Sequence, residues 1–122
     1  MRRFVGLMSG TSVDAVDAAL LEIDESGFGI RTGGFASVAI DDGLRDELHA
    51  LQASGPDELA RTMRAATTLA DRYAQAVEAL LLQCELRAEQ ITAIGAHGQT
   101  VRHRPELGYS IQLLNAARLA ER

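Results

Sequence analysis

The sequence predicts an α/β fold in which a mixed β-sheet packs against helices. The first 40 residues contain three short apolar segments separated by turn residues, which is typical of successive strands. Residues 41–84 then place apolar side chains three and four positions apart, as amphipathic helices do, and another short apolar segment follows at 91–96. This order indicates a layered α/β arrangement, and a chain of 122 residues that is 47% hydrophobic suits one domain.

Three strands are predicted at the N-terminus, at Phe4–Met8, Ala15–Ile23 and Phe28–Ile40. Because close neighbours in sequence tend to pair, they favour an antiparallel meander. Two adjacent glycines, Gly33 and Gly34, predict a bend or bulge in the third strand.

Two helices should follow. Either Asp41 or Asp42 can cap a short helix, which the turn sequence Ser-Gly-Pro at 54–56 ends. Its predicted buried positions are Leu44, Leu48 and Leu51. A long helix begins near Asp57 and has one apolar face. The positions assigned to that face are Leu59, Met63, Ala66, Ala70, Ala74, Val77, Leu81 and Cys84.

The last third of the chain predicts further strands and a final helix. A strand at Ile91–Ala96 is almost continuously apolar, which favours a strand covered on both faces. A loop at His97–Thr100 follows, and Val101–His103 and Tyr109–Leu113 are able to pair as a hairpin. A helix is predicted at Asn115–Arg122.

Charge and composition exclude several classes of partner. The net charge of −5 and the absence of a basic run longer than Arg102-His103-Arg104 argue against nucleic acid binding. The apolar run inside Met1–Met8 is too short for a signal peptide or a membrane span. A single cysteine, Cys84, forms no internal disulfide and fits a cytoplasmic protein.

The loop between the first two predicted strands has the residue pattern that most specifically indicates ligand binding. Gly10 allows a close approach of the backbone to an anion, and the hydroxyls of Ser9, Thr11 and Ser12 are donors for phosphate oxygens. The spacing is not that of a Walker loop. An ordinary polar hairpin turn is the competing interpretation.

Two longer strings resemble one enzyme family. Residues 6–20 read Gly-Leu-Met-Ser-Gly-Thr-Ser-Val-Asp-Ala-Val-Asp-Ala-Ala-Leu, which closely resembles the opening of the anhydro-N-acetylmuramic acid kinases. Residues 94–105 are similar to that family's Ser-His-Gly-Gln-Thr-Val segment, and a third stretch at 112–122 resembles its Gln-Ile-Gly-Asn and Leu-Ala-Glu-Arg region. Ala15 and Leu114 stand where the family pattern has glycine.

The resemblance implies the ribonuclease H-like lobe of the actin, hexokinase and sugar-kinase superfamily, with ATP and magnesium as cofactors. It implies that water opens the 1,6-anhydro bridge of the sugar while oxygen 6 takes the γ-phosphoryl group of ATP, which gives N-acetylmuramic acid 6-phosphate, an intermediate of cell-wall recycling. The implied nucleotide-binding residues are Gly10, Thr11, Ser12, Val13, Asp14, Ala15, Val16 and Asp17. Asp14 and Asp17 are the candidates for indirect contacts with magnesium.

The second segment supplies candidates for binding the sugar. These candidates are His97, Gly98, Gln99 and Thr100. A structural, hydrogen-bonded role is the alternative for His97. His49 and His103 have no partners at the spacing of a zinc site, and Ser12 lacks the histidine and acid of a nucleophilic triad.

No residue of this chain stands for the catalytic base, which the resemblance places in a later aspartate-containing segment. Residues 1–122 are therefore expected to form the N-terminal lobe of a two-lobe kinase whose second lobe is absent from this chain, and to be inactive alone. The alternative is a non-catalytic binding module derived from that lobe. In that case, a second copy of the chain is a candidate partner for the face that would otherwise meet the second lobe.

Overall fold

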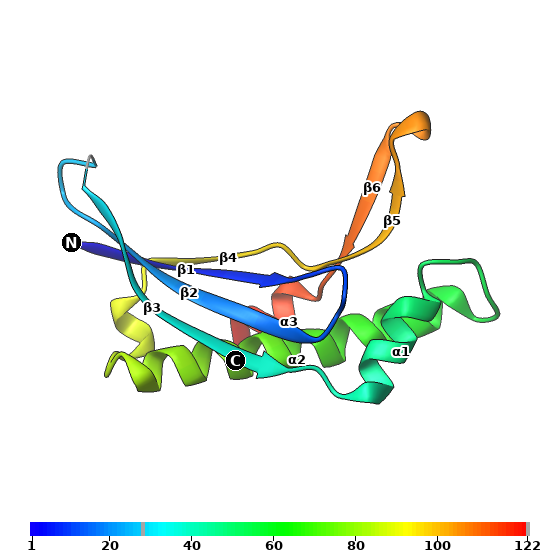
Figure 1. The fold of residues 1–122 in the computed structure, drawn as a ribbon, viewed down its shortest axis with the longest axis horizontal. Coiled ribbons are helices and arrows are strands. Elements are labelled where there is room, and N and C mark those ends of the chain that lie inside the picture. The colour runs from blue at the N-terminus through cyan, green and yellow to red at the C-terminus, as the bar shows by residue number, and fades with distance from the viewer. Residues whose placement is uncertain (28, 122) are drawn as a thin grey trace.

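The computed structural model describes residues 1–27 and 29–121, and these form one layered α/β unit (Figure 1). The strands are β1 (Arg2–Ser9), β2 (Ala15–Ile23), β3 (Ile30–Ala39), β4 (Ala93–Ala96), β5 (Gln99–Arg104) and β6 (Tyr109–Leu113). The α-helices are α1 (Asp42–Ala50), α2 (Glu58–Gln83) and α3 (Ala116–Glu121). Single 3-10 turns lie at Ala88–Gln90 and Pro105–Leu107. The predicted strand and helix ends at Phe28 and Arg122 lie outside the described residues.

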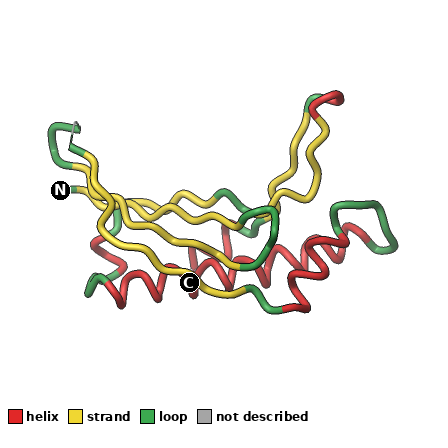
Figure 2. The backbone as a smooth tube through the Cα atoms, in the orientation of Figure 1, coloured by secondary structure: helices red, strands yellow, loops and turns green. Residues whose placement is uncertain are grey.

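The main sheet has the strand order β3-β2-β1-β4. β1 and β2 pair antiparallel, β2 and β3 pair antiparallel, and β4 runs parallel to β1. The predicted three-stranded meander within a mixed sheet is therefore confirmed. Figure 2 shows the long helix α2 running along one side of this sheet.

The glycine pair produces the predicted bulge in β3. Leu20 pairs with Gly34 while Leu21 pairs with Thr32, so Gly33 is the extra residue. A Cβ atom on Gly33 would lie 2.7 Å from a carboxylate oxygen of Glu22. Glycine at this position therefore lets β3 pass close to a buried side chain on β2.

The core lies between the sheet and α2. Tyr73, Leu69 and Leu80 are fully buried on this helix, and Val5, Val16 and Leu20 face them from the sheet. The predicted apolar face of α2 is wrong at its beginning. Leu59 and Met63 are 77% and 56% exposed, because no described element covers that side of the first turns.

Helix α1 begins as the sequence predicted, with Asp41 as the N-cap. One carboxylate oxygen of Asp41 accepts a hydrogen bond from the backbone N–H of Leu44 at 3.3 Å, and the other accepts from the Arg72 guanidinium at 3.2 Å. Burial raises the pKa of Asp41, but these hydrogen bonds outweigh it and leave the pKa below its ordinary value. The predicted buried positions of this short helix, Leu44, Leu48 and Leu51, are buried as expected.

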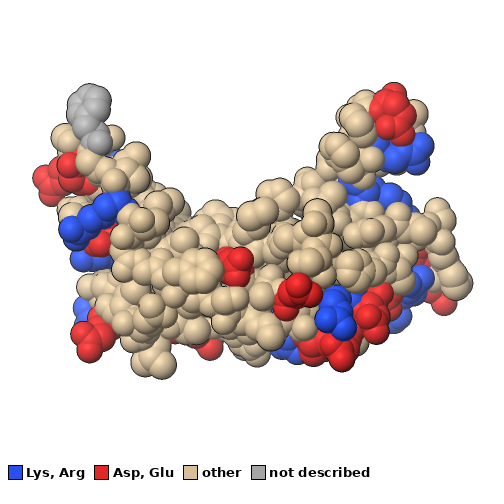
Figure 3. Space-filling view, viewed as in Figure 1, with Lys and Arg blue, Asp and Glu red and all other residues tan. Residues whose placement is uncertain are grey.

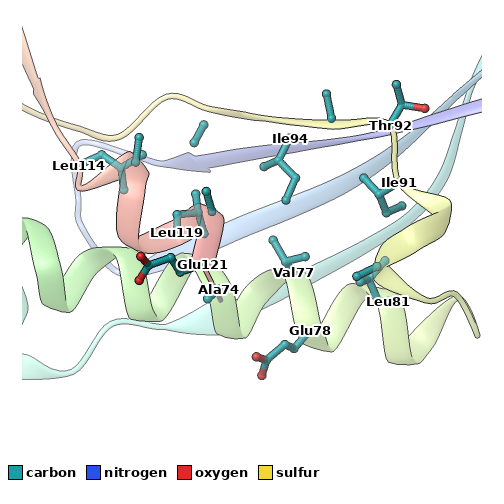
Figure 4. A pocket seen from close by; sticks show the side chains of 15 residues that line it. Ala74, Val77, Glu78, Leu81, Ile91, Thr92, Ile94, Leu114, Leu119 and Glu121 are labelled. Atoms are coloured by element: carbon teal, nitrogen blue, oxygen red, sulfur yellow. The ribbon is translucent and has the colours of Figure 1, made fainter.

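The prediction that β4 is covered on both faces is wrong. Ala93, Ile94 and Gly95 are exposed, and among the described residues β4 pairs only with β1. A groove of about 790 Å³ lies beside this edge, between α2, β4 and α3. Figure 4 shows Ile94, Val77 and Leu119 lining it. None of its lining residues belongs to the predicted nucleotide or sugar segments.

The hairpin of β5 and β6 forms a separate two-stranded sheet that projects from the body of the molecule (Figure 1). Gln99 and Thr100, predicted to lie in a loop, are the first residues of β5. Gly108 closes the hairpin with a φ of 81°, which glycine adopts without strain. No helix of the described residues is both long and apolar enough to cross a lipid bilayer.

Replacing Asp41 by alanine should remove the cap and cost about 1 kcal/mol of unfolding free energy at neutral pH. Because the folded-state pKa of Asp41 is lowered, its contribution is present above the unfolded-state pKa and is lost as the pH falls through the folded-state pKa. Urea unfolding of Asp41→Ala and the wild type at neutral and acidic pH measures this. Asp46→Ala, on the exposed side of the same helix, is the control, and an equal cost in both variants would contradict the assignment.

Candidate functional site

The loop between β1 and β2 is a tight turn with an exposed tip. The backbone N–H of Val13 donates to the carbonyl of Gly10 at 3.1 Å, and Gly10, Thr11 and Ser12 are exposed. Val13 has a φ of 57° and no exposed surface. A β-branched residue rarely adopts this conformation, so burial of its side chain holds the turn in a strained form.

The predicted nucleotide-binding residues divide into three groups by burial. Val13 and Val16 are fully buried in the core, so only their backbone is available to a ligand. Ala15 is half-buried at the start of β2. The members with exposed surface are Gly10, Thr11, Ser12, Asp14 and Asp17.

The two candidate magnesium residues turn toward different neighbours. Asp14 lies 4.0 Å from the Arg45 guanidinium on α1, with its side chain 71% exposed. Asp17 accepts a hydrogen bond from the Ser37 hydroxyl on β3 at 2.8 Å. Within the described part of the chain, no three His, Cys, Asp or Glu side chains gather as a metal site. Neither carboxylate is therefore part of a ready-made protein cage for a cation.

The second predicted segment begins where β4 ends. The backbone N–H of His97 donates to the carbonyl of Leu7 at 3.0 Å, which extends the pairing of β4 with β1. The imidazole Nδ1 of His97 lies 3.0 Å from the carbonyl oxygen of Gly98. Gly98 has a φ of 79°, and a Cβ atom there would lie 2.8 Å from the carbonyl of Leu113. Only glycine fits this turn.

A buried cluster of hydrogen bonds joins the two loops. The Ser9 hydroxyl at the end of β1 lies 2.8 Å from the Tyr73 hydroxyl and donates to the carbonyl of Gly98 at 3.4 Å. A serine hydroxyl has one hydrogen, so its oxygen then accepts from Tyr73. Burial raises the pKa of Tyr73, which keeps this donor protonated. The sequence analysis missed Tyr73, whose only signal is an aromatic residue at a helical core position.

A polar groove of about 460 Å³ adjoins the tip of the first loop. Thr11, the α1–α2 connection and the beginning of the β5–β6 hairpin enclose it. Of the predicted sugar-binding residues, Gln99 and Thr100 line this groove, whereas His97 and Gly98 do not. The full lining is Thr11, Gln52, Ala53, Ser54, Gln99, Thr100, Val101, Arg102, His103 and Arg104.

Charged side chains lie mostly outside the hollow between the β2–β3 hairpin and the β5–β6 hairpin, which both project from the body of the molecule. Figure 3 shows this hollowed edge as largely uncharged, with arginine, aspartate and glutamate side chains concentrated near the helices and at the hairpin tips. Every basic residue of the chain other than histidine is arginine. The arginines at the groove are paired with carboxylates, Arg102 with Glu58 and Arg104 with Glu106. No continuous basic face is visible in this view.

Comparison with known proteins decides the family. The anhydro-N-acetylmuramic acid kinase family matches residues 2–122. The chain belongs to the anhydro-N-acetylmuramic acid kinase family. It is 52% identical to the anhydro-N-acetylmuramic acid kinase of Bordetella petrii over 120 residues and 53% identical to that of Bordetella avium over 122 residues, with 98% of this chain aligned in each case. The corresponding enzyme of Chromobacterium violaceum is 46% identical over 118 residues.

The family assignment confirms the resemblance drawn from the two motifs. The alignments include 32%, 31% and 32% of the Bordetella petrii, Bordetella avium and Chromobacterium violaceum kinases. The chain thus spans about a third of the length of these relatives. In this family member, the parallel pairing of β1 and β4 and the hydrogen bonds of Ser9 bring both motifs to one edge of the sheet.

Tyr73→Phe should remove only the hydroxyl that donates to Ser9 and so cost about 1 kcal/mol of unfolding free energy. The ring stays in the core, so a larger loss is not expected. Chemical denaturation measures the change, with Tyr109→Phe on the exposed hairpin as the matched control. If Tyr73→Phe and Tyr109→Phe were equally stable, the Ser9 hydrogen bond would not hold the two loops together.

Proposed function

We propose that this chain is the phosphate-binding lobe of an ATP-dependent kinase acting on 1,6-anhydro-N-acetylmuramic acid. Water opens the anhydro bridge while oxygen 6 of the sugar takes the γ-phosphoryl group of ATP, which gives N-acetylmuramic acid 6-phosphate for peptidoglycan recycling in the cytoplasm. The family and its named relatives support the reaction. The exposed loop at Gly10–Ser12, beside the second motif, supports the placement of ATP.

The single observation that carries the placement is the open space around Gly10. A Cβ atom on Gly10 would meet no protein atom within 4 Å, and its φ lies outside the left-handed region. Neither packing nor backbone conformation therefore requires glycine here. Gly6 and Gly95 also lie in open space but within strands, whereas Gly10 lies in an exposed loop, where phosphate bound by backbone N–H groups would approach the backbone closely.

The neighbouring side chains suit a phosphate with its magnesium ion. The exposed hydroxyls of Thr11 and Ser12 are available as donors to phosphate oxygens. Magnesium keeps several of its waters when bound, so Asp14 and Asp17 would hold it through water molecules. Magnesium held there would supply positive charge against the charge that develops on the transferring phosphoryl group. We assign no catalytic base within this chain, because that role belongs to the second lobe.

Gly10→Ala should lower the affinity for magnesium-ATP about tenfold, equivalent to about 1.4 kcal/mol, because the new methyl group separates the backbone from the phosphate. The melting temperature should not change, since the methyl group enters open space. Gly6→Ala, also in open space but within β1, is the matched control for calorimetric titration. Equal affinities in the two variants would remove Gly10 from the phosphate site.

The function of the whole chain is tested by titrating it with ATP and magnesium in a calorimeter, beside an assay for phosphorylation of 1,6-anhydro-N-acetylmuramic acid. We expect binding without turnover, as for a lobe that holds phosphate but lacks the base. Turnover would show that these 122 residues contain the base. Failure to bind ATP would contradict the proposal and favour a non-catalytic module, for which self-association, measured by ultracentrifugation, is the next test.

A further inference from the structure

Arg45, on helix α1, forms an ion pair with one of the proposed magnesium residues. Its guanidinium lies 4.0 Å from the carboxylate of Asp14 and 2.8 Å from that of Asp42. Among the ion pairs of residues 1–27 and 29–121, the pair with Asp14 is the one that includes a predicted nucleotide-binding residue. Because a guanidinium stays charged at every physiological pH, Arg45 adds a permanent positive charge beside the end of the β1–β2 loop.

The backbone keeps Asp14 and the beginning of α1 side by side. The N–H of Ile40 donates to the carbonyl of Asp14 at 2.9 Å, and α1 begins two residues later, at Asp42. The N-cap of this helix also accepts a hydrogen bond from α2, which ties the first turn to the core helix. The position of Arg45 near Asp14 therefore follows from the backbone as well as from the ion pair.

The proposed phosphate site has no full positive charge among its own residues. Backbone N–H groups and the hydroxyls of Thr11 and Ser12 are hydrogen-bond donors with partial charges only. Asp14 and Asp17 place negative charge next to them. The chain contains no lysine, so an arginine is the side chain that can supply a fixed positive charge there. Arg45 is the arginine that the ion pair with Asp14 places at this loop.

The pair between Arg45 and Asp14 is readily exchanged for another partner. The Asp14 side chain is 71% exposed, and exposed ion pairs stabilise a fold little because water screens both charges. A guanidinium presents parallel N–H donors that match two oxygens of a phosphate group. Exchanging the Asp14 carboxylate for a phosphate therefore loses little stability and gains charge-assisted hydrogen bonds.

Magnesium at Asp14 would favour this exchange. In the proposed function, Asp14 holds the ion through water molecules. A divalent cation near this carboxylate repels the Arg45 guanidinium, because the two charges have the same sign. A phosphate group bound by the same loop then offers Arg45 a new anionic partner.

We propose that Arg45 is a further nucleotide-binding residue, whose guanidinium pairs with Asp14 in the free chain and with a phosphate group of magnesium-ATP in the complex. The inference rests on the proposed function, because it takes the β1–β2 loop as the phosphate site. It adds a residue of α1 to a site that the sequence motif confines to residues 10–17.

The test is calorimetric titration of the 122-residue chain with magnesium-ATP, comparing Arg45→Met with the wild type. Methionine keeps the apolar stem of the side chain and removes its charge. The variant should bind about tenfold more weakly, as expected for the loss of a hydrogen bond to a charged group. Its melting temperature should not change, because the pair that it removes is exposed. Arg45→Lys restores the charge without the planar fork, so it should recover part of the affinity.

Arg64→Met is the matched control, since Arg64 is an exposed arginine on α2 and its loss changes the net charge equally. This variant should bind magnesium-ATP as the wild type does. An equal loss of affinity in Arg64→Met and Arg45→Met would reduce the effect to net charge and overturn the inference.

A double-mutant cycle separates a direct phosphate contact from an effect through Asp14. Asp14→Asn removes the carboxylate, and Arg45→Met is then added to it. If Arg45 contacts phosphate, the second substitution should again weaken binding about tenfold. If it acts only by holding Asp14, the second substitution should have no effect, and the proposed contact would be wrong.

Failure of the inference and failure of the proposed function give different results. A wild-type chain that does not bind magnesium-ATP would contradict the proposed function itself. A wild type that binds, together with an Arg45→Met variant of the same affinity, would overturn only the role of Arg45.

Discussion

The parallel pairing of β1 with β4 is the constraint on which the candidate site depends. These strands are separated by more than 80 residues in the sequence, yet Leu7 pairs with Ala96, and the hydrogen bond from His97 to Leu7 continues the ladder. Parallel strands end at the same edge of a sheet. The loop after β1 and the loop after β4 must therefore leave the sheet side by side, as open α/β sheets place their ligand sites.

Helix α2 holds these two loops in a fixed position relative to each other. Its Tyr73 is fully buried, so the hydroxyl reaches Ser9 through a core that excludes water. In a low-dielectric interior, a satisfied polar contact specifies one geometry, because breaking it leaves a buried donor unpaired. Helix α2 thus forms one side of the core and also fixes the position of one loop relative to the other.

Local sequence patterns predicted the features that depend on local chemistry. The meander, the bulge at Gly33, the Asp41 cap and the hairpin ending at Gly108 each follow from residues near in sequence. The exposure of Leu59 depends instead on which distant elements reach the first turns of α2, and helical spacing carries no such information. Neighbouring residues likewise do not reveal that β4 lies at an exposed edge of the sheet, so its apolar sequence predicted a strand covered on both faces.

The sequence predicted which motif residues form the candidate site, but not how the fold buries or exposes each of them. The string from Gly10 to Asp17 gives no sign that Val13 is a core residue in a strained turn, because that depends on how the rest of the fold buries its side chain. The buried state of Gln99 likewise depends on contacts between β5 and elements that are distant in the sequence, such as α1. Tyr73 belongs to neither motif and becomes visible only through its contact with Ser9.

The two grooves differ in how well packing alone explains the residues around them. The larger groove, about 790 Å³, lies along the unpaired edge of β4, and its surface is explained by the exposure of an edge strand. Two residues around the smaller groove depart from the rules of stable packing. Val13, in the adjoining turn, has a positive φ, and the buried Oε1 of Gln99 has no hydrogen-bond partner among residues 1–27 and 29–121. Both departures lie beside the β1–β2 loop, and departures of this kind cluster at functional sites in proteins.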